Sequence, residues 1–378
     1  MLSLYIHIPW CLRKCPYCDF NSHQAADDLP EADYVEALLL DLEQDLPRVW
    51  GRTLGSIFIG GGTPSLLSAE AIDRLLSGIR ARLPLKPDLE ITLEANPGTA
   101  EQGRFADYRA AGVNRLSIGV QSFDDPRLEA LGRIHDAAEA RAAAEKARAA
   151  GFDNFNLDLM FGLPGQDTQG ALADLETAIA LGPAHISWYQ LTIEPHTWFH
   201  RHPPTLPGDD ALWQMQAAGQ ALLADKGFGQ YEVSAYAQAG RRCRHNLNYW
   251  RFGDYLGIGA GAHGKITDRA TGHVVRLAKH RHPDRYLAAR KDSVFISTET
   301  ELPAADTTFE YLMNALRLKE GFTAADFEAA TGQAFDNIRP DLETAAARGL
   351  LVLENGRVHT SERGFHFLDD LLTGLMPG

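Results

Sequence analysis

Three cysteines near the start of the chain carry the strongest chemical signal in the sequence. Cys11, Cys15 and Cys18 follow one another with the spacing Cys-x3-Cys-x2-Cys, and the fourth cysteine, Cys243, lies far away. Thiolates are the ligands of iron–sulfur clusters, which usually take four protein sulfurs. Three thiolates around a four-iron cube leave one iron open, so the spacing predicts a [4Fe–4S] cluster with an exchangeable position.

Zinc is the alternative metal for these cysteines. The same three sulfurs and a nearby imidazole, His7 or His23, would complete a four-coordinate zinc site. A disulfide framework explains the cysteines less well, because it would distribute them along a secreted chain. The chain enters a strand-like run directly, shows no signal-peptide pattern and has no apolar run of membrane-spanning length, so we expect a cytoplasmic protein.

The charge balance argues against one class of partner. Acidic residues outnumber basic residues 50 to 36, and the formal net charge is −14. A general nucleic-acid binder needs excess Lys and Arg to replace the counterions of the phosphates. We therefore expect no nucleic-acid partner.

Strand-like runs and helical segments alternate through the first two hundred residues. This alternation predicts an α/β fold with a parallel sheet, whose functional groups gather at the carboxyl ends of the strands. Six units are fewer than a closed eight-fold barrel needs, so we expect a partial (β/α)6 barrel. The predicted strands are Leu2–Ile8, Ser56–Ile59, Leu89–Glu94, Arg115–Val120, Phe155–Met160 and His185–Thr192, and the helical segments include Glu31–Leu46, Ala69–Leu83 and Ala137–Ala150.

Unusual residues stand at the ends of these predicted strands. The first strand leads into the cysteines and the second into Gly60-Gly61-Gly62-Thr63-Pro64. The third ends at Glu94, the fourth at Gln121, and the fifth contains Asp158. Gly and Pro alone simply end strands, but polar groups at successive strand ends predict one shared site.

The pattern changes after Pro204. Residues from about Asp209 to Thr298 form an irregular region, and helical segments follow it from Pro303 onward. Asn355-Gly356 between two short apolar runs is a strong hairpin signal, and helices followed by a hairpin are typical of a winged-helix module. We expect a partial barrel over 1–204, a connecting region over 205–300 and a helical, winged-helix-like module over 301–378.

The cysteine spacing, with an aromatic residue before the last cysteine, resembles the signature of the radical S-adenosylmethionine superfamily. In that superfamily the open iron of a [4Fe–4S] cluster binds S-adenosylmethionine, and one electron cleaves it to a 5′-deoxyadenosyl radical. Longer segments are similar to the family of oxygen-independent coproporphyrinogen III oxidases and their relatives. These segments are His7-Ile8-Pro9-Trp10-Cys11, Ile59–Ser65, Glu94–Pro97, Gly119–Phe123 and Asp158–Gln166.

The resemblance implies which residues hold the cofactors. The three cysteines would bind the cluster. Carboxylates suit hydroxyl or ammonium groups and an arginine suits a carboxylate, so the polar residues fit S-adenosylmethionine. The pocket for S-adenosylmethionine would be lined by Tyr5, Tyr17, Gly61, Gly62, Thr63, Glu94, Gln121, Arg133 and Asp158.

Two features favour a haem chaperone branch of this family over the oxidases. The oxidases carry a further cysteine two residues after the third cluster ligand, where this chain has Phe20. The segment from His245 to Trp250 resembles the His-Asn-x-x-Tyr-Trp motif of the chaperone branch. An imidazole is a common axial ligand of haem iron, and aromatic rings suit a macrocycle. The implied haem residues are His245, Asn246, Tyr249 and Trp250, with Arg241, Arg242 and Arg244 beside them for the propionates.

The resemblance therefore implies a haem chaperone without coproporphyrinogen oxidase activity. It would pass haem to a haem-requiring enzyme, such as a membrane-associated respiratory protein. A haem donor, a homodimer and a peripheral place at the inner membrane are compatible with that function. Three alternatives stay open: oxidative decarboxylation of coproporphyrinogen III, another radical reaction on a tetrapyrrole such as methylation or ring opening, and a zinc-binding structural protein.

Overall fold

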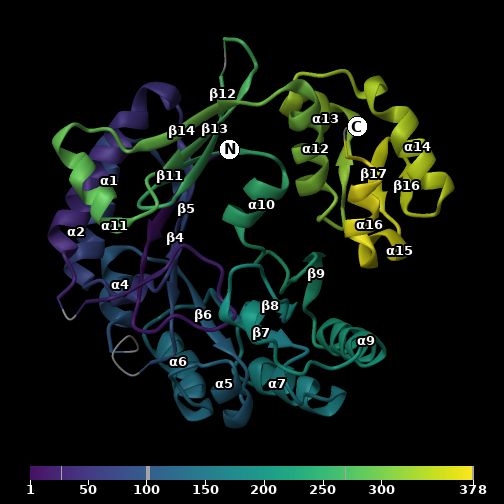
Figure 1. Cartoon of the computed structure of the whole chain (residues 1–378), viewed down its shortest axis with the longest axis horizontal. Helices are drawn as coiled ribbons and strands as arrows, with labels where there is room; N and C mark the ends of the chain where they lie inside the picture. The colour runs from purple at the N-terminus through teal and green to yellow at the C-terminus, as the bar shows by residue number, and fades with distance from the viewer. Residues whose placement is uncertain (27, 99–102, 269, 377–378) are drawn as a thin grey trace.

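One mixed sheet of 12 strands runs through most of the chain, in a computed structural model that describes residues 1–26, 28–98, 103–268 and 270–376 (Figure 1). Its strands are β1 Leu2–Ile8, β4 Leu54–Gly61, β5 Leu85–Ala95, β6 Arg115–Gln121, β7 Phe155–Phe161, β8 His185–Gln190, β9 Gly229–Glu232, β10 Ala235–Ala237, β11 Asp254–Ile258, β12 His263–Thr267, β13 Val274–Lys279 and β14 Ile296–Glu301. Their order is β14-β13-β12-β11-β1-β4-β5-β6-β7-β8-β10-β9. The strands from β11 to β8 in this order are parallel, and the strands beyond either end are antiparallel.

Helices connect these strands, and a two-stranded ladder lies in the cysteine loop. The helices of this part are α1 Glu31–Asp45, α2 Ala69–Arg82, α4 Phe105–Ala111, α5 Asp125–Ala130, α6 Ala137–Ala149, α7 Thr168–Ala180, α8 Trp198–Arg201, α9 Asp209–Asp225, α10 Arg244–Trp250 and α11 Pro283–Ala288, and the 3-10 turns are Leu46–Val49, Pro64–Leu66 and Ala289–Lys291. The ladder pairs β2 Trp10–Cys11 with β3 His23–Gln24.

The predicted partial barrel is confirmed. The six strands expected from the sequence are β1 and β4 to β8, each parallel to the next. The description of residues 209–298 as irregular was wrong, because this region forms α9 and the strands β9 to β14. Most of these strands are short, so each carries little alternation of apolar and polar residues for sequence analysis to detect. β11 also contains a glycine, and it pairs with β12 at one position, Tyr255 with Lys265.

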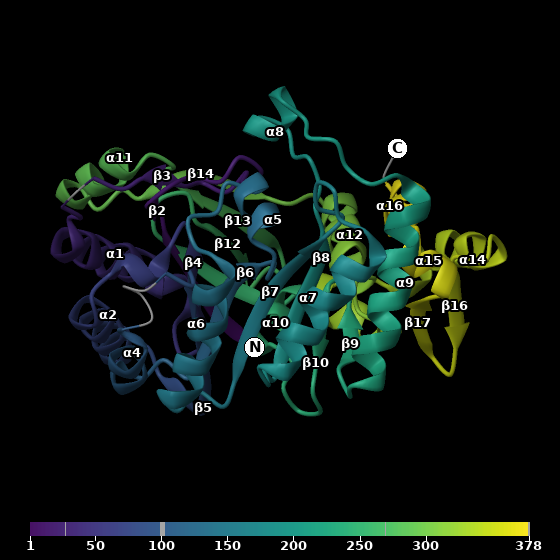
Figure 2. The same ribbon diagram turned by 90° about the horizontal axis from the view of Figure 1, so that it is seen from below.

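The two faces of the parallel sheet differ in polarity. Successive side chains of a strand point to opposite faces. The outer face is apolar and packs against the helices that Figure 2 shows around the sheet. The other face, which we call the inner face, is the side on which α10 lies in Figure 1. Inner-face residues include Ser3, Ser56, Glu90, Arg115, Ser117, Asn156, Asp158 and His185, all buried or half-buried.

The chain ends in a second, smaller core. Its elements are α12 Ala304–Ala315, β15 Phe322–Thr323, α13 Ala324–Thr331, a 3-10 turn Phe335–Asn337, α14 Arg339–Ala347, β16 Leu351–Glu354, β17 Arg357–Thr360, α15 Glu362–His366 and α16 Leu368–Thr373. Helices before an antiparallel β15-β17-β16 sheet have the winged-helix order, and Asn355 and Gly356 adopt φ of 51° and 73° in the predicted hairpin turn. The residue boundaries at 204 and 300 stay a prediction. None of the helices in the described ranges is both long and apolar enough to cross a bilayer.

A buried lysine joins the strands after α10 to the first helix of the barrel. Lys279 on β13 is buried, and its Nζ lies 2.6 Å from Asp41 Oδ1 and 2.7 Å from Asp45 Oδ2, both on α1. Tyr286 donates a further hydrogen bond to Asp41 at 2.6 Å. Burial raises the pKa of Asp41 to about 6. The Asp41 carboxylate therefore depends on the lysine to remain charged in the interior.

Lys279→Met should destabilise the fold by about 3–5 kcal/mol at pH 7, because it leaves buried carboxylates without a cation. Urea unfolding measures this loss. The matched control is Lys226→Met, since Lys226 pairs with Asp225 on the surface and should contribute less than about 1 kcal/mol. Equal effects of the two substitutions would show that the buried lysine does not hold β13 to α1.

Candidate functional site

A cavity of about 440 Å³ lies at the carboxyl ends of the parallel strands. The three cysteines line it together with eight of the nine residues expected to bind S-adenosylmethionine: Tyr17, Gly61, Gly62, Thr63, Glu94, Gln121, Arg133 and Asp158. Tyr5 does not line the cavity; its ring stacks on Phe58, and its hydroxyl lies 2.9 Å from His7 Nδ1. Sequence analysis did not name Ser117, Met160 and Tyr189, which also line the cavity.

The glycine run fixes the cysteine loop to the sheet. Gly62 N donates to Ile8 O and Thr63 N donates to Trp10 O, both at 2.7 Å. A Cβ atom at Gly62 would lie 2.4 Å from the carbonyl oxygen of Trp10, so a side chain cannot fit there. The predicted glycine motif therefore acts through close backbone approach.

The three thiols line the cavity as candidate metal ligands. Burial raises the pKa of Cys11 and of Cys18, so metal binding must release protons. Within the part of the chain that the structure describes, no three His, Cys, Asp or Glu side chains converge on a single-ion site. Both ring nitrogens of His7, one candidate zinc ligand, already have hydrogen-bond partners at 2.9 Å and 2.8 Å. Nε2 of His23, the other candidate, is buried and has no partner among the described residues.

Arg133 brings a buried positive charge to the cavity. Its guanidinium lies 3.5 Å from Cys15 Sγ and donates to Asn96 Oδ1 at 2.9 Å and to Gly119 O at 2.7 Å. Its Nε is buried and has no hydrogen-bond partner among the described residues. No carboxylate of the described chain pairs with this cation, so a ligand carboxylate would complete its contacts.

The same cavity holds two half-buried carboxylates, Glu94 and Asp158. Burial, followed by the negative charge of Asp158, raises the pKa of Glu94 to about 8. Glu94 accepts a hydrogen bond from Gly61 N at 3.1 Å. A ligand with a positive group and hydroxyls would favour the ionised carboxylates. Together with Arg133, the cavity matches a ligand that carries both a carboxylate and cationic groups.

A chain of hydrogen bonds runs from Asp158 through the interior of the sheet. Asn156 Nδ2 and Ser117 Oγ donate to its two oxygens at 2.8 Å and 2.9 Å. The ring of His185 lies 2.7 Å from Asn156 Oδ1 and 2.8 Å from Tyr231 Oη. Burial lowers the pKa of His185 well below its usual value, so the neutral ring donates to the amide and accepts from the phenol. Each donor thus points toward Asp158. These hydrogen bonds favour its carboxylate, but burial outweighs them and raises the pKa of Asp158 above its usual value.

The predicted haem motif closes the opposite, amino end of the sheet. His245 is buried, with Nδ1 3.0 Å from Ser56 Oγ and Nε2 2.9 Å from Tyr249 Oη. Burial lowers the pKa of His245 to about 3. The backbone N–H groups of Arg244 and His245 donate to the carboxylate of Glu90 at 3.2 Å and 3.1 Å, which caps the first turn of α10. His245 therefore has no free ring nitrogen in this arrangement.

The other predicted haem residues also make contacts within the protein. Arg317 covers the ring of Trp250 at 4.3 Å, and Tyr249 packs edge-on against Tyr255 at 4.5 Å, while Asn246 is half-buried on the same helix. The three arginines expected to pair with propionates have carboxylate partners: Arg241 with Asp153, Arg242 with Glu320 and Arg244 with Asp88. The motif as arranged does not fit haem. Haem ligation by His245 stays a prediction that requires α10 to leave the sheet.

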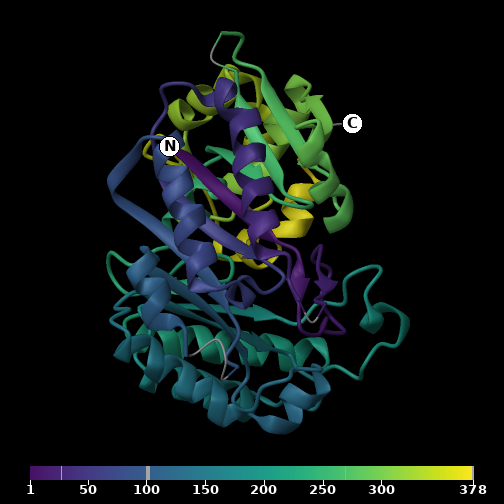
Figure 3. The ribbon, with the colours of Figure 1, turned by 90° about the vertical axis from the view of Figure 1, so that its left-hand side faces the viewer.

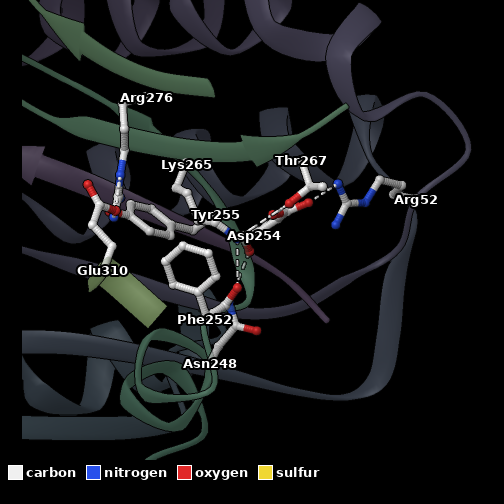
Figure 4. A network of polar contacts seen from close by, with 9 residues as sticks. All are labelled: Arg52, Asn248, Phe252, Asp254, Tyr255, Lys265, Thr267, Arg276 and Glu310. Carbon is white, nitrogen blue, oxygen red and sulfur yellow. Dashed lines mark hydrogen bonds and ion pairs between the residues drawn. The ribbon is translucent and has the colours of Figure 1, made fainter. Parts of the chain in front are cut away.

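A buried lysine fixes the turn that follows α10 (Figure 4). Lys265 Nζ donates to Phe252 O at 2.7 Å and to Asp254 Oδ1 at 3.0 Å, and Arg52 pairs with the other carboxylate oxygen at 2.7 Å. Phe252 has a φ of 55°, a left-handed conformation that bulky residues rarely adopt without support. Glu90 at its start and Lys265 after its end thus hold α10 in place.

Tyr231→Phe should destabilise the protein by about 1–3 kcal/mol, because it leaves buried His185 without its donor and Cys243 N without its acceptor. Urea unfolding measures the change. Tyr311→Phe is the matched control, since Tyr311 is buried and its hydroxyl has no hydrogen bond within the described ranges. A loss no larger than in the control would contradict a continuous chain from Asp158 to α10.

Family comparisons cover both parts of the chain. The radical SAM superfamily model matches residues 5–178, and the model of the HemN C-terminal domain matches residues 302–367. The protein named heme chaperone HemW from Escherichia coli (strain K12) is 54% identical over 371 residues, which span 98% of this chain and 97% of that protein. The one from Bacillus subtilis (strain 168) is 35% identical over 374 residues, 96% of each chain.

Two further comparisons extend this picture. A mouse protein named radical S-adenosyl methionine domain-containing protein 1, mitochondrial, is 36% identical over 393 residues, covering 99% of this chain and 87% of that protein. Among solved structures, the coproporphyrinogen III oxidase HemN from Escherichia coli has a TM-score of 0.83 at 22% identity, covering 99% of this chain and 89% of that chain. This structural likeness shows the fold.

Proposed function

The chain belongs to the HemW family of radical S-adenosylmethionine proteins, and from this premise we propose that it is a haem chaperone. It binds haem and passes it to a haem-requiring enzyme. The observation that carries the proposal is the 54% identity to a protein named heme chaperone HemW, over nearly the full length of both chains. Phe20, at the position where the related oxidases have a cysteine, agrees with a chaperone that has no coproporphyrinogen oxidase activity.

The proposal includes a [4Fe–4S] cluster on Cys11, Cys15 and Cys18. The cluster, when bound, supplies one electron and an open iron for S-adenosylmethionine. The residues around the cavity fit that ligand. Arg133 would hold its methionine carboxylate, because the guanidinium has no carboxylate partner in the described chain. Glu94 and Asp158 would accept hydrogen bonds from its ammonium or ribose hydroxyl groups.

The proposal also places the protein in its cellular setting. A membrane-associated respiratory enzyme is the proposed acceptor, and the protein would work in the cytoplasm or at the inner face of the membrane. A homodimer agrees with this function. The acceptor, the cellular location and the homodimer are inferred from the family resemblance and from the proposed transfer of haem.

Haem transfer is the experiment that tests the proposed function. Anaerobically reconstituted protein, loaded with haem, should restore the spectrum and activity of a haem-free respiratory enzyme faster than the same concentration of free haem. Cys18→Ser should lose the cluster, measured as bound iron and sulfide, because two thiolates cannot hold the four-iron cube. Turnover of coproporphyrinogen III, or transfer no faster than from free haem, would contradict the chaperone function.

Binding of S-adenosylmethionine should release protons. The pKa of Glu94 is about 8 without ligand, so the group is largely protonated at pH 7, and a cationic ligand favours its ionised form. Affinity should therefore rise as pH increases from about 6 to 8, by up to about tenfold per pH unit. Calorimetry in two buffers of different ionisation heat measures the protons released.

Two variants complete this test. Glu94→Gln should weaken binding and remove the pH dependence, whereas Glu176→Gln, a change at an exposed carboxylate on α7, should leave both unchanged. Binding that is independent of pH in the wild-type protein would show that Glu94 does not face the cationic part of the ligand.

A further inference from the structure

Large apolar side chains are exposed on segments that lie next to the cavity in the chain or contact its cysteine loop. Leu12 and Phe20 belong to the cysteine loop and are 49% and 57% exposed. Ile134, next to Arg133, is 49% exposed, and Trp198 at the start of α8 is 60% exposed. We call Leu12, Phe20, Ile134 and Trp198 the mouth patch. Phe20 lines the cavity, Leu12 and Ile134 each adjoin a lining residue in the chain, and Trp198 precedes Phe199, which contacts the cysteine loop. Exposed apolar residues on segments that meet at one cavity suit a binding surface.

Helix α8 joins the mouth patch to the cysteine loop. Phe199 N donates to Pro16 O at 3.0 Å, and the Phe199 ring packs against Tyr17 at 6.4 Å. Figure 2 shows α8 standing clear of the body of the protein, and Figure 3 shows this teal segment beside the purple cysteine loop. Side chains from residues far apart in the sequence thus contribute to one rim.

The segment of α8 also presents two exposed imidazoles. The His202 ring stacks on Trp198 at 3.9 Å and an interplanar angle of 21°, which fixes its orientation. Neither its ring nitrogens nor those of His200 have a hydrogen-bond partner within the described residues. A neutral imidazole with a free nitrogen is a common axial ligand of haem iron. His245, by contrast, has both ring nitrogens engaged.

Cations stand at the same rim. Arg13 and Arg201 are exposed and have no ion-pair partner in the described chain. Lys14 follows Arg13 in sequence, and its Nζ donates to Phe20 O at 2.9 Å. Asp19 and Glu194 are the carboxylates that also line this side of the cavity. Arg13 and Arg201 are therefore cations of this region that no carboxylate of the described chain neutralises through an ion pair. The two propionates of haem require such partners.

We propose that haem docks on the mouth patch, with His202 as axial ligand of the iron and Arg13 and Arg201 beside the propionates. This inference rests on the proposed function, because it places the cargo of the chaperone. An open rim leaves one face of the haem accessible to an acceptor. The site also shares the loop of the cluster ligands, so haem and S-adenosylmethionine would bind on either side of Pro16-Tyr17.

Haem titration of anaerobically reconstituted protein tests the site, followed through the Soret band. His202→Ala should raise the dissociation constant at least about tenfold, the loss found when even outer partners of a metal ligand are removed, and should shift the Soret maximum. His202→Met keeps a haem ligand and should bind haem with an altered spectrum. His245→Ala and His273→Ala, a change at an exposed histidine outside the rim, should keep wild-type affinity, and all variants should keep their iron and sulfide.

The outcomes separate this inference from the proposed function. Stoichiometric binding that is indifferent to His202 but lost in His245→Ala would overturn the mouth patch as the haem site and leave the chaperone function standing. Binding that is indifferent to both residues would also overturn it. Absence of specific haem binding to the wild-type protein would overturn the function and the inference together.

Discussion

The polar inner face of the parallel sheet is the constraint on which the rest of the structure depends. Buried polar groups must be hydrogen-bonded, and unpaired buried charges are costly. At the amino end, α10 satisfies the sheet through Glu90 and His245. In the middle, His185 and Asn156 link strands to one another. At the carboxyl end, Arg133, Glu94 and Asp158 line the cavity, so the candidate site lies where the internal network reaches the cavity.

Much of the fold and of the cofactor cavity could be predicted from the sequence. Strand alternation and helical segments placed β1 and β4 to β8, and the Asn355-Gly356 hairpin lies where expected. Polar residues at successive strand ends proved to line one cavity. Tyr5 was the exception, because its ring stacks on Phe58 and its hydroxyl hydrogen-bonds with His7 on the inner face of the sheet. Ser117 and Tyr189 were overlooked, although their alternation with apolar neighbours was a detectable signal.

The remainder could not be predicted, because it depends on contacts between distant residues. A His-Asn-x-x-Tyr-Trp segment looks suited to a macrocycle when its residue types are considered alone. Its burial is decided by Ser56 and Glu90, which are more than a hundred residues away in sequence. The short strands β9 to β14 gain their stability from the sheet that they extend, and Lys279 pairs with α1 only in three dimensions. Exposed imidazoles on α8 carry no sequence signal of their own.

The cavity is proposed to hold a cluster whose open iron binds S-adenosylmethionine beside Arg133 and Glu94. Electron paramagnetic resonance of the reduced, reconstituted protein with and without S-adenosylmethionine tests this assignment most directly. A ligand that binds the open iron must change the g values of the cluster. We expect a changed signal in the wild-type protein and a weaker or absent change in Arg133→Ala with the cluster retained. An identical signal with and without S-adenosylmethionine would contradict the assignment of the cavity to cluster and ligand together.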